Sequence, residues 1–287
     1  GEMIGHNVDH GRLFIEKNGL SSLLSITATT YKKAKFVKPH SKSVLAHSLL
    51  LICRRLSRHH STSIFKQLVE SVTEQLTSVE NFDDSNEDHL KSLDIISGLL
   101  KSMFGMFSQT NAPYLADWTT TKGKDLMLVV AKLDRKVRWR LSVRKVQQEE
   151  EAKVPTDVPL VDSKEAISTS SSSTRKRRAS LKKTKKPEDQ ASKVMAQFTS
   201  ATEHLYDSLQ KAIFFGLRQF EERRATNQPP SQQAHALANS LVENLCALIT
   251  DFSTLESSLE AKCCYMNNVT SCIHSIVVSE RHRNINT

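Results

Sequence analysis

The sequence predicts an all-α fold in which amphipathic helices stack as a bundle or an α-solenoid. Glycine occurs only 8 times and proline 7 times in 287 residues, so the chain has few of the residues that β-turns and hairpins need. Outside residues 149–190, apolar residues return every three or four positions, which is the spacing of amphipathic helices. Such helices bury their apolar stripes against one another, as in bundles and helical repeats.

The first 148 residues are predicted to form a helical repeat segment. One short helix ends near Ile15, Asn18-Gly19 has the pattern of a helix end with Gly19 as the C′ residue, and Leu20 begins the next helix. Apolar stripes then predict four further helices, over 44–56, 64–79, 90–107 and about 122–146.

A change in composition separates this segment from a second helical segment. Residues 149–189 contain seven consecutive hydroxyl residues, Ser168 to Thr174, followed by a basic run, and are predicted to be a disordered linker. Residues 190–287 are predicted to continue the solenoid, with helices over 190–220 and 237–252 and a last helix that a capping box, Ser253 and Glu256, would start. The sequence leaves open whether the two segments pack together across the linker.

The net charge of +9 is concentrated in that linker, which identifies a candidate nuclear-import signal. Ser180, preceded by Arg177-Arg178-Ala179, is a phosphorylation candidate, and a phosphate there would remove nearly two charges. The alternative is a solvated linker that no receptor reads. The run has no aromatic residues for base stacking, so nucleic acid is not favoured as the primary partner. The signal consists of Arg175, Lys176, Arg177, Arg178, Lys182, Lys183, Lys185 and Lys186.

No catalytic, cofactor-binding or metal-binding residue is predicted, because the chain has no G-x-S-x-G, H-E-x-x-H or glycine-rich phosphate motif. The spacing of Cys263, Cys264, Cys272 and His274 does not match a zinc knuckle, so buried free cysteines on a helix face are the favoured interpretation. Five cysteines without a C-x-x-C pair favour a reducing compartment. No apolar run approaches the roughly 18 residues of a membrane span.

Two motifs carry a resemblance to a known family. The run from Leu13 to Leu24 resembles the helix–glycine–helix junction of armadillo-type repeats. The spacing W-x4-G-x15-W, formed by Trp118, Gly123 and Trp139, resembles the N-terminal solenoid of the giant HECT-type E3 ubiquitin ligases, the Tom1/Mule group. The order of helices, low-complexity insert and polar loop, at Gln228 to Gln233, is also similar.

The resemblance implies an armadillo/HEAT-like α-solenoid segment that positions protein substrates for a ligase. The catalytic cysteine of that family lies in a C-terminal HECT domain that this chain does not contain, so no cysteine here inherits its role. The alternative function is an independent helical adaptor that the basic run directs to the nucleus. Either function predicts protein partners, an import receptor if the basic run is read, no cofactor, and a location in nucleus and cytoplasm.

Overall fold

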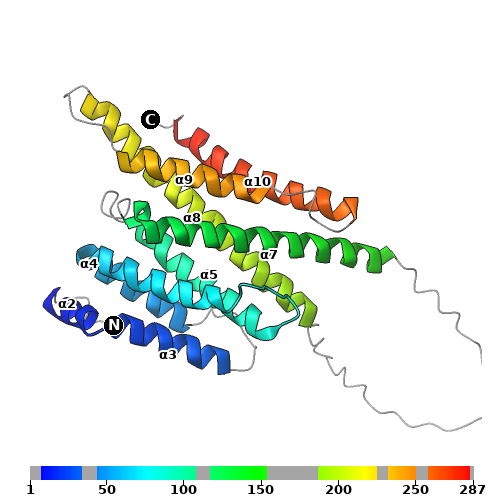
Figure 1. Ribbon diagram of the computed structural model, residues 1–287, viewed down its shortest axis with the longest axis horizontal. Helices are drawn as coiled ribbons and strands as arrows, with labels where there is room; N and C mark the ends of the chain where they lie inside the picture. The colour runs from blue at the N-terminus through cyan, green and yellow to red at the C-terminus, as the bar shows by residue number, and fades with distance from the viewer. Residues whose placement is uncertain are drawn as a thin grey trace, which may run out of the picture.

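A computed structural model describes residues 8–33, 44–107, 117–153, 187–224, 232–249 and 258–284. Every long element among these residues is an α-helix, so the predicted all-α class is confirmed. The helices are α2 (Val8–Glu16), α3 (Gly19–Lys33), α4 (Val44–Thr77), α5 (Glu87–Phe107), α7 (Thr121–Lys153), α8 (Pro187–Arg224), α9 (Gln232–Ile249) and α10 (Leu259–Asn284) (Figure 1).

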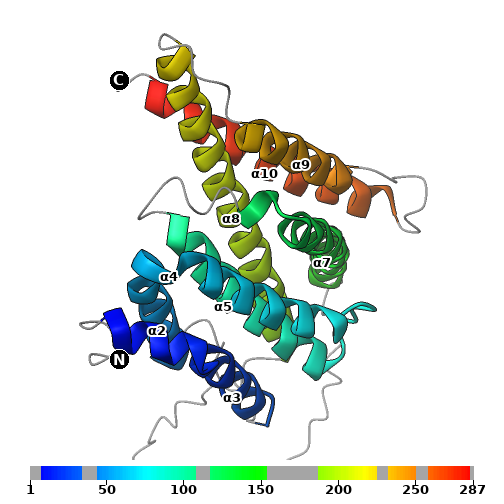
Figure 2. The same ribbon diagram turned by 60° about the vertical axis from the view of Figure 1, so that its left-hand side comes forward.

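The helices stack in rows that follow the order of the chain, and one long helix crosses them. Helices α2 and α3 pack on α4, α4 packs on α5, and α9 and α10 pack on α7. Helix α8 crosses this stack and contacts α5, α7, α9 and α10 (Figure 2). The segments on either side of the linker therefore pack together, which the sequence left open. The all-α class is established, while the solenoid arrangement stays a prediction.

The junction between α2 and α3 differs in detail from the sequence prediction. The residue with a left-handed backbone is Asn18, with φ of 55°, and not Gly19. Asparagine tolerates this conformation better than most residues. Gly19 instead allows a close approach, because an ideal Cβ there would lie 2.8 Å from the carbonyl oxygen of Phe14. Both residues are needed for the turn, for different reasons.

Two predicted helices, over 44–56 and 64–79, are joined into the single helix α4 with a kink. His60 is the kink residue, with φ of −134° and ψ of 35°. The chain therefore passes from one predicted helix to the next without a loop. His59 is exposed, whereas His60 is only partly exposed.

The limits of the later helices also differ from the predictions. Helix α7 continues to Lys153 and α8 begins at Pro187, so both ends of the predicted linker, 149–189, are helical. The predicted capping box at Ser253 and Glu256 lies outside the described residues. Helix α10 is instead capped by Ser258, whose Oγ accepts a hydrogen bond from the Ala261 amide at 3.3 Å.

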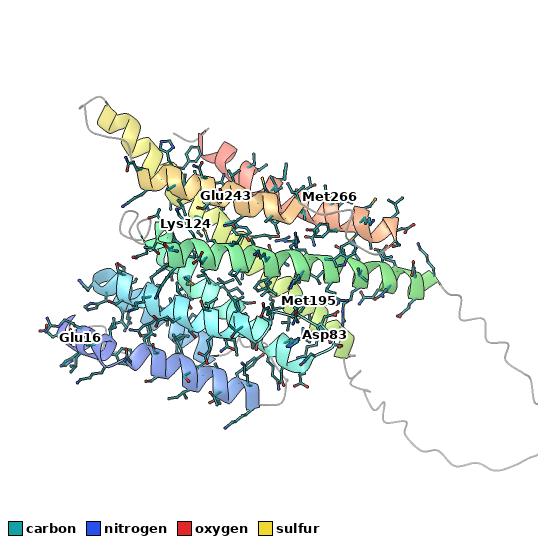
Figure 3. All side chains as sticks on the ribbon, viewed as in Figure 1. Glu16, Asp83, Lys124, Met195, Glu243 and Met266 are labelled. Atoms are coloured by element: carbon teal, nitrogen blue, oxygen red, sulfur yellow. The ribbon has the colours of Figure 1, made fainter. Side chains whose placement is uncertain are left out.

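Side chains fill the spaces between the helices and form one core (Figure 3). Helix α8 contributes the fully buried Met195, Phe198, Leu205 and Leu209, which is expected of a helix packed between others. None of the described helices is both long and apolar enough to span a membrane.

Candidate functional site

The residues predicted to form an import signal, 175–186, and the phosphorylation candidate Ser180 lie outside the described residues. The cysteines do not gather in one place. Cys53 and Cys272 are buried, Cys264 is partly buried, and Cys246 and Cys263 are exposed. The prediction of buried cysteines is therefore wrong for Cys263, because that side of α10 faces away from α7 and α9.

Burial also makes the two enclosed thiols poor nucleophiles. It raises the pKa of Cys53 and of Cys272 to about 12, so both are protonated thiols at neutral pH. Within the described parts of the chain, no three His, Cys, Asp or Glu side chains are placed to hold a metal ion.

The two tryptophans of the W-x4-G-x15-W motif lie at contacts with different neighbouring helices. Trp118 is buried and packs edge-on against Phe65 of α4, with ring centroids 5.0 Å apart. Trp139 packs edge-on against Tyr265 of α10 at 5.7 Å. The motif thus joins α7 to the first helical segment at one end and to the second at the other.

The glycine of the motif lies where α7 turns back onto the tryptophan. An ideal Cβ on Gly123 would lie 2.7 Å from the carbonyl oxygen of Asp117 and 2.8 Å from the Cα of Trp118. Thr120 caps the helix here, and its Oγ1 accepts a hydrogen bond from the Gly123 amide at 3.2 Å. Any larger residue would have to displace backbone, which explains a glycine inside a long helix.

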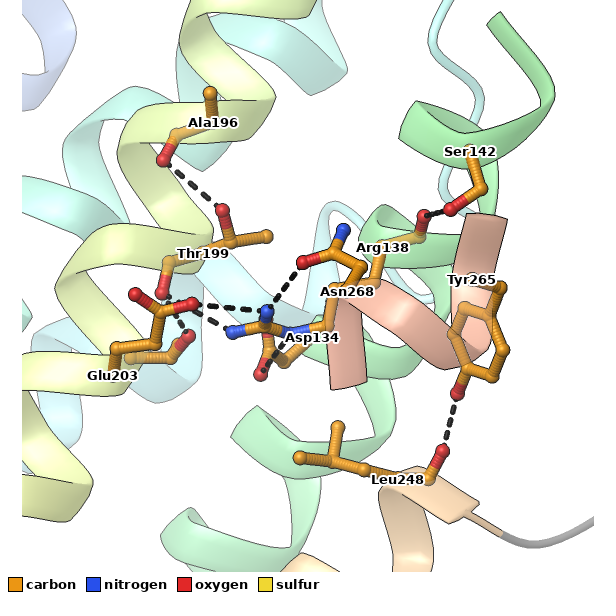
Figure 4. A network of polar contacts seen from close by, with 10 residues as sticks. Asp134, Arg138, Ser142, Ala196, Thr199, Glu203, Leu248, Tyr265 and Asn268 are labelled. Carbon is orange, nitrogen blue, oxygen red and sulfur yellow. Dashed lines mark hydrogen bonds and ion pairs between the residues drawn. The ribbon is translucent and has the colours of Figure 1, made fainter. Parts of the chain in front are cut away.

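The strongest cluster of charged groups is buried around Arg138, and the sequence analysis did not find it. The side chains of Arg138 and Asp134 are both fully buried, and Arg138 Nε donates to Asp134 Oδ2 at 3.1 Å. Arg138 Nη1 donates at 3.0 Å to both Glu203 Oε1 on α8 and Asn268 Oδ1 on α10 (Figure 4). One guanidinium therefore connects three helices, two of which follow the linker.

Electrostatics in this cluster follow from burial and from the ion pair. Burial raises the pKa of Asp134, and the neighbouring Arg138 opposes that change without cancelling it. Burial acts to lower the pKa of Arg138, but the acidic groups around it, Asp134 foremost, together outweigh that effect, so the arginine stays protonated. Because neither the Asp134 nor the Arg138 side chain reaches solvent, a substrate has no access to this ion pair, and we assign it a structural role.

A groove with a volume of about 710 Å³ lies between the second half of α4, with the turn that follows it, and the first half of α7. We call it the α4–α7 groove. These two stretches run side by side in the same direction (Figure 1). Its apolar lining consists of Val69 and Leu76 from α4, Val79 from the turn that follows α4, and Leu126, Val129 and Leu133 from α7.

Charged side chains form the rims of the α4–α7 groove. The α4 rim carries Glu70 and Glu80, and both side chains are exposed. The opposite rim is mainly basic, although it includes one carboxylate. Its charged residues are Lys122, Asp125, Lys132 and Lys136.

Comparison with known proteins gives no match to a family model, a curated protein or a solved structure. The fold and its surfaces therefore have to be interpreted from their own chemistry.

Proposed function

We propose that this chain is a non-catalytic, protein-binding scaffold segment of a HECT-type E3 ubiquitin ligase. The observation that carries the proposal is the W-x4-G-x15-W motif that resembles that family. Trp118 and Trp139 each pack against a neighbouring helix, and Gly123 permits the close turn onto Trp118, so the three residues have a structural reason to occur at this spacing. The α4–α7 groove supports the binding part of the proposal, because large concave surfaces with an apolar lining are common binding sites.

The buried charge cluster and the protonated thiols support a scaffold in preference to a catalytic domain. Arg138 and Asp134 hold helices together out of reach of solvent, and Cys272 beside them is kept as a thiol. A ligase cysteine has to meet the ubiquitin-loaded cysteine of its partner enzyme, which requires an exposed and reactive thiolate. In this proposal the transfer step belongs to the HECT domain of the parent protein, as the family resemblance implies.

The first test is the open reading frame that encodes this chain. A HECT domain downstream is expected, and a stop codon soon after Thr287 without such a domain would exclude the proposal. In the parent ligase, deletion of residues 8–284 should leave loading of the HECT cysteine with ubiquitin unchanged and abolish modification of substrates. Unchanged substrate modification would contradict the scaffold role.

A second candidate function, an independent nuclear adaptor, is favoured by the basic run of residues 175–186. A fluorescent reporter carrying residues 165–190 tests it. The reporter should accumulate in the nucleus, and Ser180→Glu should reduce accumulation because it adds a negative charge to the cluster. Equal distribution of this reporter and of a reporter without residues 175–186 would exclude import by this route.

A further inference from the structure

The dimensions of the α4–α7 groove correspond to a short helix. One wall runs from Val69 along α4 to Thr77 and through the following turn to Glu80, and the α7 wall runs from Lys122 to Lys136. At 1.5 Å per residue the helical parts of these walls are about 12 and 21 Å long, or roughly two to four helical turns. Proteins that bind an amphipathic helix in a groove contact its apolar residues at positions i, i+3, i+4 and i+7, which span just over two turns.

The groove is held open by contacts at both ends. At one end the Lys136 ammonium donates to the Glu80 carbonyl oxygen at 2.8 Å and links the two walls. At the other end Trp118, which directly precedes α7, packs against Phe65 of α4. A site preformed in this way saves the ordering cost that a mobile surface would incur on binding.

One apolar side chain of the lining is accessible. Val129 keeps 44% of its surface exposed, although it belongs to a helix with a large buried face. The side chains around Val129 in the groove, such as Leu76 and Leu133, are themselves buried and provide a firm base. Covering Val129 would therefore remove apolar surface from water without rearranging the core.

The rims select the charge of the occupant. A helix lying in the groove would place one flank over Glu70 and Glu80 and the other over Lys122 and Lys132. Opposite charges across such an interface steer association and disfavour wrong partners. Turning a helix end for end exchanges its flanks, so the same charges also determine the direction in which a helix with one basic and one acidic flank binds.

We propose that the α4–α7 groove binds an amphipathic helix of a partner protein, with an apolar stripe, a basic flank over α4 and an acidic flank over α7. The inference rests on the proposed function in one respect, namely that the chain acts by binding proteins. It makes no use of the HECT domain.

A synthetic peptide of about fourteen residues tests the inference. The peptide is helical, with leucines at i, i+3, i+4 and i+7, lysines along one flank and glutamates along the other. Its binding to the full 287-residue chain is measured by fluorescence anisotropy. Val129→Asp should weaken binding at least about tenfold, because it places a charge in the apolar lining. The matched control is Val277→Asp on α10, at a valine that is 57% exposed and far from the groove, and it should leave affinity within about twofold.

A charge exchange tests the assignment of the rims. A second peptide carries glutamates on both flanks and should bind the wild-type chain about fivefold more weakly than the first, as expected for exposed charge contacts. In the double variant Glu70→Lys with Glu80→Lys, both rims are basic, and the order of the two peptides should reverse. An unchanged order would overturn the charge assignment and with it the proposal.

Other outcomes are equally decisive. Absence of binding by the wild-type chain, or equal loss in Val129→Asp and Val277→Asp, would overturn the inference. Self-association of the wild-type chain that Val129→Asp abolishes, seen by sedimentation velocity, would assign the groove to a second copy and also overturn it. Circular dichroism of each variant verifies that the fold is retained. A parent protein without a HECT domain would reject the proposed function while groove binding persists, so the two failures are distinguishable.

Discussion

Two stretches of α7 differ in the kind of side chain that they expose and bury. At Val129 the helix exposes an apolar side chain to the α4–α7 groove, whereas within the next two and a half turns it buries Asp134 and Arg138 completely. Residue type alone would predict the reverse. The difference arises from the neighbours, because the second stretch is enclosed by α8 and α10 while the first borders a gap beside α4.

The comparison separates stability from recognition. A buried arginine is tolerated only because Asp134, Glu203 and Asn268 accept hydrogen bonds from its guanidinium. An exposed valine needs no such partners, and its exposure reduces the stability of the fold only slightly. We therefore expect substitutions along α7 to have their largest effects on folding near Arg138 and their largest effects on binding near Val129.

The largest effect is expected for Arg138→Met. It removes the cation and leaves the Asp134 carboxylate buried without its ion pair, and the free energy of unfolding should fall by about 3–5 kcal/mol. Urea denaturation followed by circular dichroism measures the change.

The control is the double variant Asp134→Leu with Arg138→Met, which replaces the ion pair by apolar side chains. It should recover most of the lost stability, because no unpaired charge remains buried. A single variant that stays within about 1 kcal/mol of the wild type would show that Arg138 is not enclosed as the structure indicates.

A part of the Arg138→Met effect should depend on pH. Burial raises the pKa of Asp134 above its ordinary value of 3.8, so the folded state binds this proton more tightly than the unfolded state. Tighter binding of this proton adds to the free energy of unfolding. That contribution is fully present below pH 3.8 and is lost as pH rises through the folded-state pKa. Loss of the arginine raises that pKa further, so the deficit relative to wild type should grow from about pH 4.5 to about pH 7.5.

The same denaturation experiment at the two pH values measures this dependence. The double variant also lacks Arg138 and has no carboxylate at position 134, so the difference between the two variants isolates the contribution of Asp134. A deficit in Arg138→Met that is constant with pH would mean that Asp134 does not take up the proton when it loses its partner.

An intermediate effect is expected for Gly123→Ala, at the start of the groove. The added methyl group would meet the backbone of Asp117 and Trp118, which cannot move as a flexible side chain could. The free energy of unfolding should fall by about 1–3 kcal/mol. Lys124→Ala, an exposed change at the next residue, is the control and should be nearly neutral. If Gly123→Ala stabilises the protein, as alanine does in an ordinary helix interior, the close approach at Trp118 is absent.

The sequence was sufficient for the helices and insufficient for the cluster around Arg138. Apolar stripes predict helices because burial of one face determines their spacing. Asp134 and Arg138, in contrast, are four residues apart on a helix, which is also the pattern of an exposed ion pair. One signal was available: Asp134 lies on the same helical face as Val130, Val137 and Leu141, which form an apolar stripe. Its partners on α8 and α10 could not be predicted, because they follow the linker.

The α4–α7 groove could not be predicted from the sequence either. Its existence depends on the distance between two helices, which is determined by the side chains between them and by the contacts at each end. The Lys136–Glu80 contact joins residues 56 positions apart, and neither residue is distinctive in the sequence. The tryptophans were recognised because W-x4-G-x15-W is a fixed spacing, whereas their opposite attachments to α4 and α10 required the structure.

The smallest effect is expected in a matched pair of substitutions at adjacent valines. Val129→Thr introduces a hydroxyl at a position that is 44% exposed and should change the free energy of unfolding by less than about 0.5 kcal/mol. Val130→Thr introduces the same hydroxyl at a position with no exposed surface, and burial of the polar group should cost about 1–3 kcal/mol. The two substitutions have the same shape, so the difference measured by urea denaturation reports solvent access alone. Equal costs at the two positions would mean that the groove is closed in solution, and a closed groove could not receive a helix.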